Sequence, residues 1–290
     1  MKLRAALRQI RPGHWAKNAF VLAPLLFSKR LDEWSGIVDA VAATIVFSLV
    51  ASCVYVINDW RDRESDAQHP LKRDRPLASG ALDGRDAVLI VVALIVLAAA
   101  VGIAAGLPLA FYGVVAIYVA INIAYSFGLR HVDLVDIIVI AAGFVLRVLA
   151  GTTALDVTAS DFIVLSTGLL ALLLGLGKRR MDLALETAED RRSLAGYSVE
   201  FIDAALATLA ASTIAFYSLF TVSDYAVERY GSHDLYLTTF FVVVGILRYL
   251  QVVLNDGPRR TPTEIALSDR FMQVVVGLWT VFFYILAYHT

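Results

Sequence analysis

The sequence has little charge for its length and one thiol. Its 290 residues contain a single cysteine, Cys53, and 18% charged residues, and the acids and bases nearly balance to a net charge of −1. A lone cysteine excludes a disulfide-framed secreted domain, and the balanced charge excludes a basic nucleic-acid-binding protein. Hydrophobic residues make up 59% of the chain, which excludes a disordered polypeptide. Cys53 is predicted to be a small buried apolar side chain.

Long uncharged runs indicate a membrane protein. Residues 87–129 contain no Asp, Glu, Lys or Arg, and this run is twice the roughly 20 residues that a spanning helix needs. Gly106-Leu107-Pro108 in its middle predicts a tight turn between two helices. Further spans are expected at 37–58, 134–153, 161–177, 204–223, 235–254 and 271–289, with a weaker first span at 14–27. The sequence therefore predicts an all-α integral membrane protein of about nine transmembrane helices, with residues 1–290 forming one domain.

The basic residues are distributed unevenly between the two sides of these spans. Twenty of the 25 Lys and Arg residues fall on one side if the N-terminus is cytoplasmic, and three fall on the other. The positive-inside rule then predicts a multi-pass protein of the plasma (inner) membrane. Its N-terminus and its two long charged loops, 59–86 and 178–203, are expected in the cytoplasm, and the lipid bilayer is its first partner.

The loop after the second span begins with acids at helical spacing. If the helix continues past the membrane surface, its 100° turn per residue places Asn58, Asp59, Asp62 and Asp66 on one strip. Like charges at this spacing repel without a cation between them. Mg²⁺ prefers oxygen ligands and is usually held by one or two carboxylates plus substrate phosphates. The strip is therefore predicted to bind Mg²⁺ bridging to a diphosphate, and the alternative is a solvated acidic helix end.

Basic residues follow in the same loop. Lys72, Arg73 and Arg75 stand beside the acidic strip. Cations for phosphate oxygens and carboxylates for a metal are the two halves of a phosphate–Mg²⁺ site. We therefore interpret these three side chains as phosphate-binding residues.

These residues together carry a family resemblance. Asn58-Asp59-x-x-Asp62-x-x-x-Asp66, followed by Arg75-Pro76-Leu77-Ala78-Ser79-Gly80, resembles the first aspartate motif of the UbiA superfamily of intramembrane prenyltransferases. The resemblance covers essentially the whole chain. It implies a nine-helix bundle with a cytoplasmic-side cavity, Mg²⁺ as cofactor, and catalytic, metal-binding roles for the three aspartates.

The second charged loop opens with three cations, Lys178, Arg179 and Arg180, before Asp182. They are interpreted either as an additional phosphate site or as a positive-inside anchor. Aromatic-acceptor members of the superfamily carry a second aspartate motif here. The Lys-Arg-Arg form is instead similar to the polyprenyl-phosphate phosphoribosyltransferase branch, such as the actinobacterial decaprenyl-phosphate enzymes. Helices that end on one membrane face allow both loops to converge on one pocket.

Three other stretches resemble that branch. They are Arg11-Pro12-x-x-Trp15-x-Lys17-Asn18, Asn122-x-x-Tyr125-Ser126, and Gly143-Phe144-Val145-Leu146-Arg147-Val148-Leu149-Ala150-Gly151. The resemblance implies that the phosphate of a polyprenyl (decaprenyl) phosphate attacks C1 of 5-phosphoribosyl 1-diphosphate (PRPP), and pyrophosphate leaves. The product would be a precursor of cell-wall arabinan. Lys17, Tyr125 and Ser126 are then expected to bind phosphate or ribose. The alternatives are a Lys17 that only reaches towards the membrane surface and a Tyr125 that is an interfacial residue without a function.

Some charged residues stay outside this assignment. Arg147 lies about 16 Å deeper along its helix than Asp136, and a backbone carbonyl, Asp156 or Asp161 are its candidate partners. Asp133 and Asp136 are either helix caps or ligands. The oligomeric state stays open, and a homo-oligomer is compatible with the sequence.

Two other functions compete with phosphoribosyl transfer. A UbiA-type aromatic prenyltransferase would use a polyprenyl diphosphate donor, and the three cations at 178–180 argue against it. A secondary transporter also contains charges within broken helices. It is disfavoured because nearly all the charges gather at one face.

Overall fold

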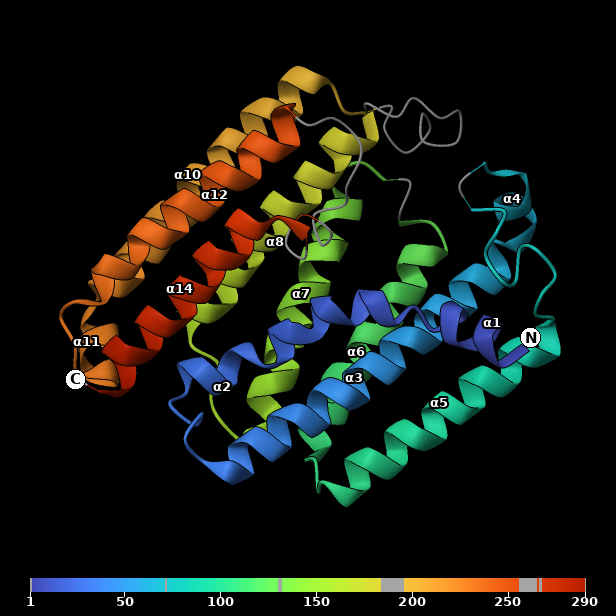
Figure 1. The fold of residues 1–290 in the computed structure, drawn as a ribbon, viewed down its shortest axis with the longest axis horizontal. Coiled ribbons are helices and arrows are strands. Elements are labelled where there is room, and N and C mark those ends of the chain that lie inside the picture. The colour runs from blue at the N-terminus through green and yellow to red at the C-terminus, as the bar shows by residue number, and fades with distance from the viewer. Residues whose placement is uncertain are drawn as a thin grey trace. The chain divides into compact units, whose positions relative to one another are not determined.

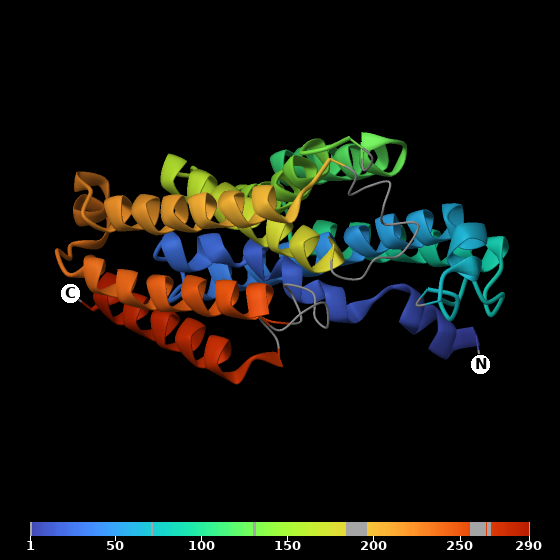
Figure 2. The same cartoon turned by 90° about the horizontal axis from the view of Figure 1, so that it is seen from above.

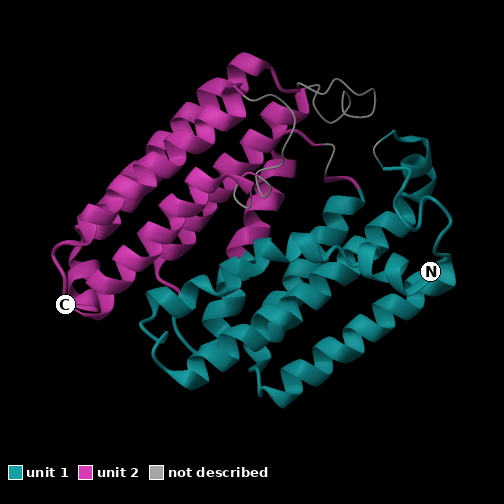
Figure 3. Cartoon of the chain, in the orientation of Figure 1, with its two compact units in different colours: residues 1–127, 146–158 teal, residues 128–145, 159–290 magenta. Residues whose placement is uncertain are grey.

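The computed structural model describes residues 2–70, 72–129, 132–183, 196–255, 265 and 268–289. Within these ranges the chain forms helices and no β-strand. It divides into two compact units, shown in Figure 3: residues 1–127 with 146–158, and residues 128–145 with 159–290. We call them unit 1 and unit 2. The helix α7 (Val135–Ala154) contributes to both. That the chain acts as one catalytic domain stays a prediction.

Unit 1 contains the N-terminal helices and the end of α7. Its elements are α1 (Lys2–Gln9), η1 (Pro12–Val21), α2 (Ala23–Phe27), α3 (Trp34–Arg61), α4 (Arg63–Gln68), α5 (Gly84–Ala104) and α6 (Leu109–Ser126). The element η1 is a 3₁₀ helix. α3 packs along α5, and the two run side by side in Figure 1.

Unit 2 contains the first half of α7 and the C-terminal helices. Its other elements are α8 (Asp161–Leu183), α10 (Val199–Thr221), α11 (Asp224–Tyr230), η3 (Leu235–Thr238), α12 (Thr239–Asn255) and α14 (Arg270–Tyr288). α10 packs against α8 and α12, and α12 packs against α14. Figure 2 shows α12 and α14 side by side.

Eight helices of the described residues are long and apolar enough to cross a membrane. They are α3, α5, α6, α7, α8, α10, η3 with α12, and α14, and they match eight of the predicted spans. The side chains of α5 that face away from the protein are apolar, with Leu89 67% and Val96 62% exposed. Such a surface suits hydrocarbon, and the chain is a multi-pass membrane protein.

The predicted weak span at 14–27 is not one continuous α-helix. Its residues form η1 and the short α2, joined at Leu22. Pro24 explains the break, because its ring would clash with the carbonyl four residues earlier and it has no N–H to donate. The prediction of nine spanning helices is therefore approximate.

The predicted hairpin at 106–108 is confirmed. α5 ends at Ala104, and Gly106 adopts φ +66°, a left-handed conformation that glycine accepts without strain. Pro108 is the N-cap of α6, where a residue without an N–H costs no intrahelical bond.

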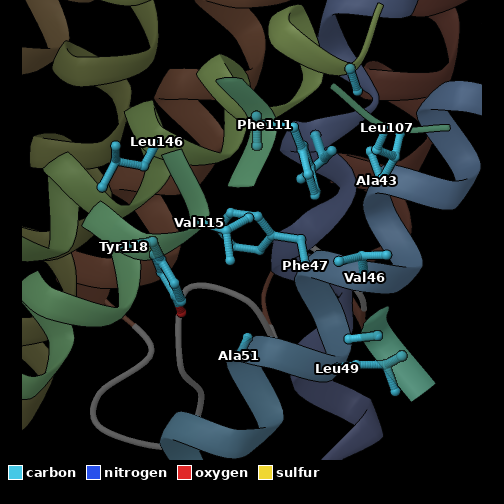
Figure 4. Packing of buried hydrophobic residues seen from close by; sticks show 14 of the residues in the cluster. Ala43, Val46, Phe47, Leu49, Ala51, Leu107, Phe111, Val115, Tyr118 and Leu146 are labelled. Atoms are coloured by element: carbon cyan, nitrogen blue, oxygen red, sulfur yellow. The ribbon is translucent and has the colours of Figure 1, made fainter. Parts of the chain in front are cut away.

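A hydrophobic cluster fixes η1, α3, α5, α6 and the end of α7 within unit 1. Figure 4 shows Phe47 of α3 beside Val115 and Tyr118 of α6. The ring centroids of Phe47 and Tyr118 are 4.6 Å apart. Phe47 and Phe111 are fully buried, so this packing holds α3 and α6 at a fixed spacing.

Candidate active site

Asp59 lies in the last turn of α3. The 28 residues of this helix span about 42 Å, more than the roughly 30 Å of a hydrocarbon core. The helix is therefore long enough to carry its charged C-terminal turn beyond the apolar segment. Yet Asp59 is only 5% exposed, so protein groups rather than water surround its carboxylate.

Three side chains donate hydrogen bonds to Asp59. Gln9 Nε2 lies 2.7 Å from Oδ2, and Arg11 Nη2 lies 2.5 and 2.8 Å from the two oxygens. Arg75 Nη1 lies 3.2 Å from Oδ1. Gln9 and Arg11 come from the N-terminal segment and were not predicted as site residues. Arg11 belongs to the 11–18 motif, and Gln9 carries no sequence signal.

Arg75 joins two of the predicted carboxylates. The same Nη1 atom that reaches Asp59 also lies 2.7 Å from Asp66 Oδ2. Asp66 is 3% exposed. Two buried carboxylates on one nitrogen would repel each other without the guanidinium charge between them. We call Gln9, Arg11, Asp59, Asp66 and Arg75 the carboxylate cluster.

The predicted acidic strip is not one continuous helix. α3 ends at Arg61, Asp62 is its C-cap with φ −88° and ψ 5°, and α4 begins at Arg63. This break turns the chain, so the four residues 58, 59, 62 and 66 do not follow one α-helical strip. Residues 58–66 contain no proline or glycine that would mark the break. Asp62 is half-buried at the junction.

Asn58 points to α6 instead of joining the carboxylate cluster. Its Oδ1 accepts a hydrogen bond of 2.6 Å from Ser126 Oγ. Arg61 donates to the Ser126 carbonyl and lies over the Phe127 ring, 4.5 Å from its centroid. The structure thus brings Asn58 and Ser126, two predicted site residues far apart in sequence, into direct contact.

The other predicted residues of unit 1 lie on three elements. Lys72 is half-buried and Arg73 exposed on the loop that carries Arg75, and Tyr125 is half-buried beside Ser126. Lys17 is half-buried on η1. Their roles as phosphate ligands stay predictions.

Arg147 is buried within unit 1. Its Nε donates to Asn18 Oδ1 at 2.8 Å, and its Nη2 donates to the Tyr118 hydroxyl at 3.2 Å. Neither side chain is among the partners expected from the sequence, which were a backbone carbonyl, Asp156 or Asp161.

In unit 2, Arg179 is the centre of a buried ion pair. Its Nε and Nη2 both lie 2.6 Å from Asp136 Oδ2, and its Nη1 lies 3.2 Å from Asp182. The side chains of Arg179 and Asp136 are 9% and 1% exposed. Arg179, which was predicted as a substrate ligand, thus already forms ion pairs with two carboxylates.

Lys178 and Arg180, the sequence neighbours of Arg179, are less buried than Arg179. Lys178 is exposed, and Arg180 pairs with Asp203 at 2.7 Å. Glu186 and Asp190 stand four and eight residues after Asp182, a spacing that would place the three acids on one side of a helix. Both lie outside the described residues. Of the three cations, Lys178 is therefore the most accessible to a ligand.

Tyr197 completes the buried pair. Its hydroxyl donates to Asp136 Oδ1 at 2.8 Å and accepts from the Leu134 N–H at 2.7 Å. Burial, reinforced by the hydrogen bond to the Asp136 carboxylate, raises the pKa of Tyr197 to about 12. The neutral phenol is thus the form that the fold prefers.

This shift predicts a loss of stability in alkali. A folded-state pKa above the usual 10 contributes stability that is fully present below pH 10 and is lost as pH rises towards 12. We expect the purified protein to lose more thermal stability between pH 9 and pH 11.5 than Tyr197→Phe does. Equal pH dependence of the melting temperatures of both proteins would contradict the assignment.

The carboxylate cluster fits a magnesium–phosphate site. Among the residues that the structure describes, no three or more His, Cys, Asp or Glu side chains form a metal-ligand group. Two carboxylates plus substrate phosphates suffice for Mg²⁺, and Asp59 and Asp66 already share one positive group. Gln9 Oε1 is buried and has no hydrogen-bond partner in the described part of the chain. This orphaned oxygen beside Asp59 is a further hard donor or an acceptor for a metal-bound water.

Comparison with protein families decides the family. The model of the UbiA prenyltransferase family matches residues 19–275. The chain belongs to the UbiA prenyltransferase family. Asp59, Asp66 and Arg75 of the carboxylate cluster lie within the matched residues, and their role as an aspartate motif stays a prediction.

Curated relatives of this UbiA protein cover nearly its full length. Decaprenyl-phosphate phosphoribosyltransferase of Corynebacterium glutamicum is 32% identical over 94% of this chain and 83% of its own length. The enzyme of the same name from Mycobacterium tuberculosis is 33% identical over 94% of this chain and 91% of its own length.

Solved structures show the same fold. A UbiA homologue from Archaeoglobus fulgidus bound to GPP and Mg²⁺ superposes with a TM-score of 0.71 at 18% identity, covering 98% of this chain and 99% of that chain. A digeranylgeranylglyceryl phosphate synthase structure gives 0.65 at 16% identity, covering 100% of this chain and 99% of that chain.

Proposed function

We propose that this UbiA protein transfers 5-phosphoribose from PRPP to a polyprenyl phosphate, decaprenyl phosphate in the first instance, and releases pyrophosphate. The observation that carries the proposal is the identity of 32–33% over 94% of the chain to curated decaprenyl-phosphate phosphoribosyltransferases. The charges of unit 1 support it, because a donor with two phosphate-bearing ends and an anionic acceptor need many cations.

The reaction exchanges one C–O bond for another. An oxygen of the acceptor phosphate forms a bond to C1 of the ribose, while the bond from C1 to the diphosphate breaks and pyrophosphate takes the electron pair. The acceptor oxygen is already anionic, so the step needs no strong general base. Catalysis is then positioning and stabilisation of charge in an oxocarbenium-like transition state.

The carboxylate cluster is the proposed binding place of the leaving diphosphate. Mg²⁺ bound by Asp59, Asp66 and Asp62, with Asn58 nearby, would neutralise the diphosphate charge as the bond breaks. Arg75 and Arg11 hold the aspartates now, and both guanidinium groups can turn from carboxylate to phosphate when the donor binds. Lys72 and Arg73 lie on the same loop and would add charge.

Lys17 is suited to a second phosphate. Along a 3₁₀ helix, which rises about 2.0 Å per residue, it lies roughly 12 Å from Arg11. That separation exceeds the size of one diphosphate, so the two cations can serve two phosphate groups. We propose that Lys17 binds the 5-phosphate or the acceptor phosphate, with Tyr125 and Ser126 as further ligands. Of the three predicted cations of unit 2, Lys178 is the most accessible, and we propose it as a phosphate ligand.

The proposed place of action is the inner face of the plasma membrane. Twenty of 25 basic residues and the carboxylate cluster belong to segments that the positive-inside rule assigns to the cytoplasm. PRPP is water-soluble and polyprenyl phosphate is a membrane lipid, so the reaction needs a site where helices end at the bilayer surface. Production of a cell-wall arabinan precursor is the role that we infer.

One comparison of substrates tests the proposal. The purified protein receives either PRPP with decaprenyl phosphate or a polyprenyl diphosphate with an aromatic acid, each with Mg²⁺. We expect product only from the first pair. Prenylated aromatic product from the second pair would replace the proposal with aromatic prenyl transfer, and PRPP that crosses sealed vesicles unchanged would indicate transport.

The Asp62→Asn variant is the matched control for this assay. Asp62 is half-buried at the junction of α3 and α4, so its amide should leave the protein inserted and folded. We expect turnover to fall below detection while gel-filtration and melting behaviour stay unchanged. Full activity of the purified variant would remove Asp62 from the site.

A further inference from the structure

The 3₁₀ helix η1 is unusually long. It extends over ten residues, Pro12–Val21, whereas such helices rarely exceed three or four residues because their hydrogen bonds are poorer. Its N-cap, Arg11, has φ 51° and ψ 61°, a left-handed conformation that is uncommon outside glycine. Tertiary contacts must therefore hold this segment in its conformation.

A period of three residues gives η1 two distinct faces. One face carries Trp15, Asn18 and Val21, and the adjacent face carries Lys17. Trp15 Nε1 donates to Ser52 Oγ at 3.0 Å, and Asn18 Nδ2 donates to Ser48 Oγ at 2.9 Å. The first face is thus hydrogen-bonded to α3 at two positions that are one α-helical turn apart.

Arg147 of α7 also contacts this face of η1, through the side chain of Asn18. Arg147 Nε donates a hydrogen bond of 2.8 Å to Asn18 Oδ1, whereas Asn18 Nδ2 donates its hydrogen bond to Ser48 Oγ. The guanidinium lies 5.2 Å from the Phe47 ring centroid and 5.0 Å from that of Tyr118. Arg147 is 5% exposed. An ionisable residue buried in a spanning helix is costly and points to a function.

Gly151, one turn beyond Arg147, provides a second contact with η1. A Cβ atom at this position would lie 2.1 Å from the Val21 carbonyl oxygen. Only glycine allows the backbones of α7 and η1 to approach this closely. Arg147 and Gly151 belong to the 143–151 motif, to which the reaction itself assigns no role, and both act on η1.

We propose that Arg147 is a positioning residue that keeps η1 in its 3₁₀ form and thereby presents Lys17 to a substrate phosphate. A 3₁₀ helix turns 120° per residue and an α-helix 100°, so relaxation over three residues rotates a side chain by about 60°. Such a rotation would carry the Lys17 ammonium away from its ligand. This inference rests on the proposed phosphate-binding role of Lys17.

A double-mutant cycle tests the link between the two residues. Arg147→Met should lower kcat/KM for phosphoribosyl transfer by about 10²-fold, the scale of a displacement of about 1 Å at an active site. In a Lys17→Ala background, Arg147→Met should lower kcat/KM by less than a further threefold, because the ammonium group that Arg147 positions is absent. Losses that multiply independently would overturn the proposal.

Two further variants separate positioning from general stability. Leu146→Ala removes a buried side chain of the hydrophobic cluster of unit 1, next to Arg147 in the sequence. It should lower the melting temperature while KM for both substrates stays unchanged. Arg147→Lys, which keeps the charge but loses the geometry of the Asn18 bond, should recover only part of the activity. Equal KM changes in Leu146→Ala and Arg147→Met would contradict a specific role.

The reactivity of Lys17 gives a readout that does not need turnover. Acetylation of Lys17, followed by mass spectrometry, should be suppressed by PRPP or decaprenyl phosphate in the parent protein and not in Arg147→Met. Equal protection in both proteins would refute positioning. Protection by PRPP or decaprenyl phosphate in the parent protein alone, without any transfer between these two substrates, would refute the proposed function while supporting this inference.

Discussion

Replacing Asp66 with asparagine is expected to lower the rate of phosphoribosyl transfer by about 10³-fold, the scale seen when one preorganised electrostatic group is removed from an active site. The Asp66 carboxylate is 3% exposed and shares Arg75 Nη1 with Asp59. The amide keeps the shape but removes the charge, so both the metal and Arg75 lose a partner. Initial rates at several Mg²⁺ concentrations measure the effect.

Asp74→Asn is the matched control for that variant. It makes the same chemical change in the same loop, at an exposed position where the backbone carbonyl, and not the carboxylate, accepts from Arg8. We expect near-parental activity from it. An Asp66→Asn protein with more than a tenth of the parental rate would show that the carboxylate cluster is not the diphosphate site.

The largest expected effect on stability comes from Arg179→Met. Removing this guanidinium leaves Asp136, whose side chain is 1% exposed, as an uncompensated buried charge. Breaking a buried ion pair in this way costs about 3–5 kcal/mol. We expect a large fall in the melting temperature of the detergent-solubilised protein, far beyond that of Lys178→Met, whose parent side chain is exposed.

A second substitution distinguishes a structural Arg179 from a substrate ligand. In the double variant Arg179→Met, Asp136→Leu, both charges are replaced by apolar groups, which often restores stability. If Arg179 is structural, the double variant should regain much of its melting temperature and also its activity. Recovered stability with activity still absent would return Arg179 to the list of phosphate ligands.

Features that depend on local sequence could be predicted. The uncharged run 87–129 is long enough for two helices only, and Gly106 and Pro108 mark the turn because each backbone preference is a local property. The break between α3 and α4 could not be predicted, since residues 58–66 contain neither glycine nor proline. Their spacing alone is compatible with one helix.

Contacts between segments far apart in the chain could not be predicted from the sequence. Gln9 has no charge and belongs to no motif, yet it lies 2.7 Å from Asp59, 50 residues away. Likewise, the depth of Arg147 along α7 was predictable from the rise per residue, but its bond to Asn18, 129 residues away, depends on the packing of η1. The motifs predict which kinds of side chain the site contains, whereas the fold determines which of these side chains contact one another.

The fate of each phosphorus atom of PRPP tests the central claim most directly. The purified protein, decaprenyl phosphate and Mg²⁺ are incubated with PRPP labelled either in the 5-phosphate or in the diphosphate, and lipid is then extracted. We predict that the 5-phosphate label enters the lipid fraction and that the diphosphate label appears in water as pyrophosphate. Both labels remaining in the aqueous fraction, with active protein shown by bound PRPP, would contradict phosphoribosyl transfer.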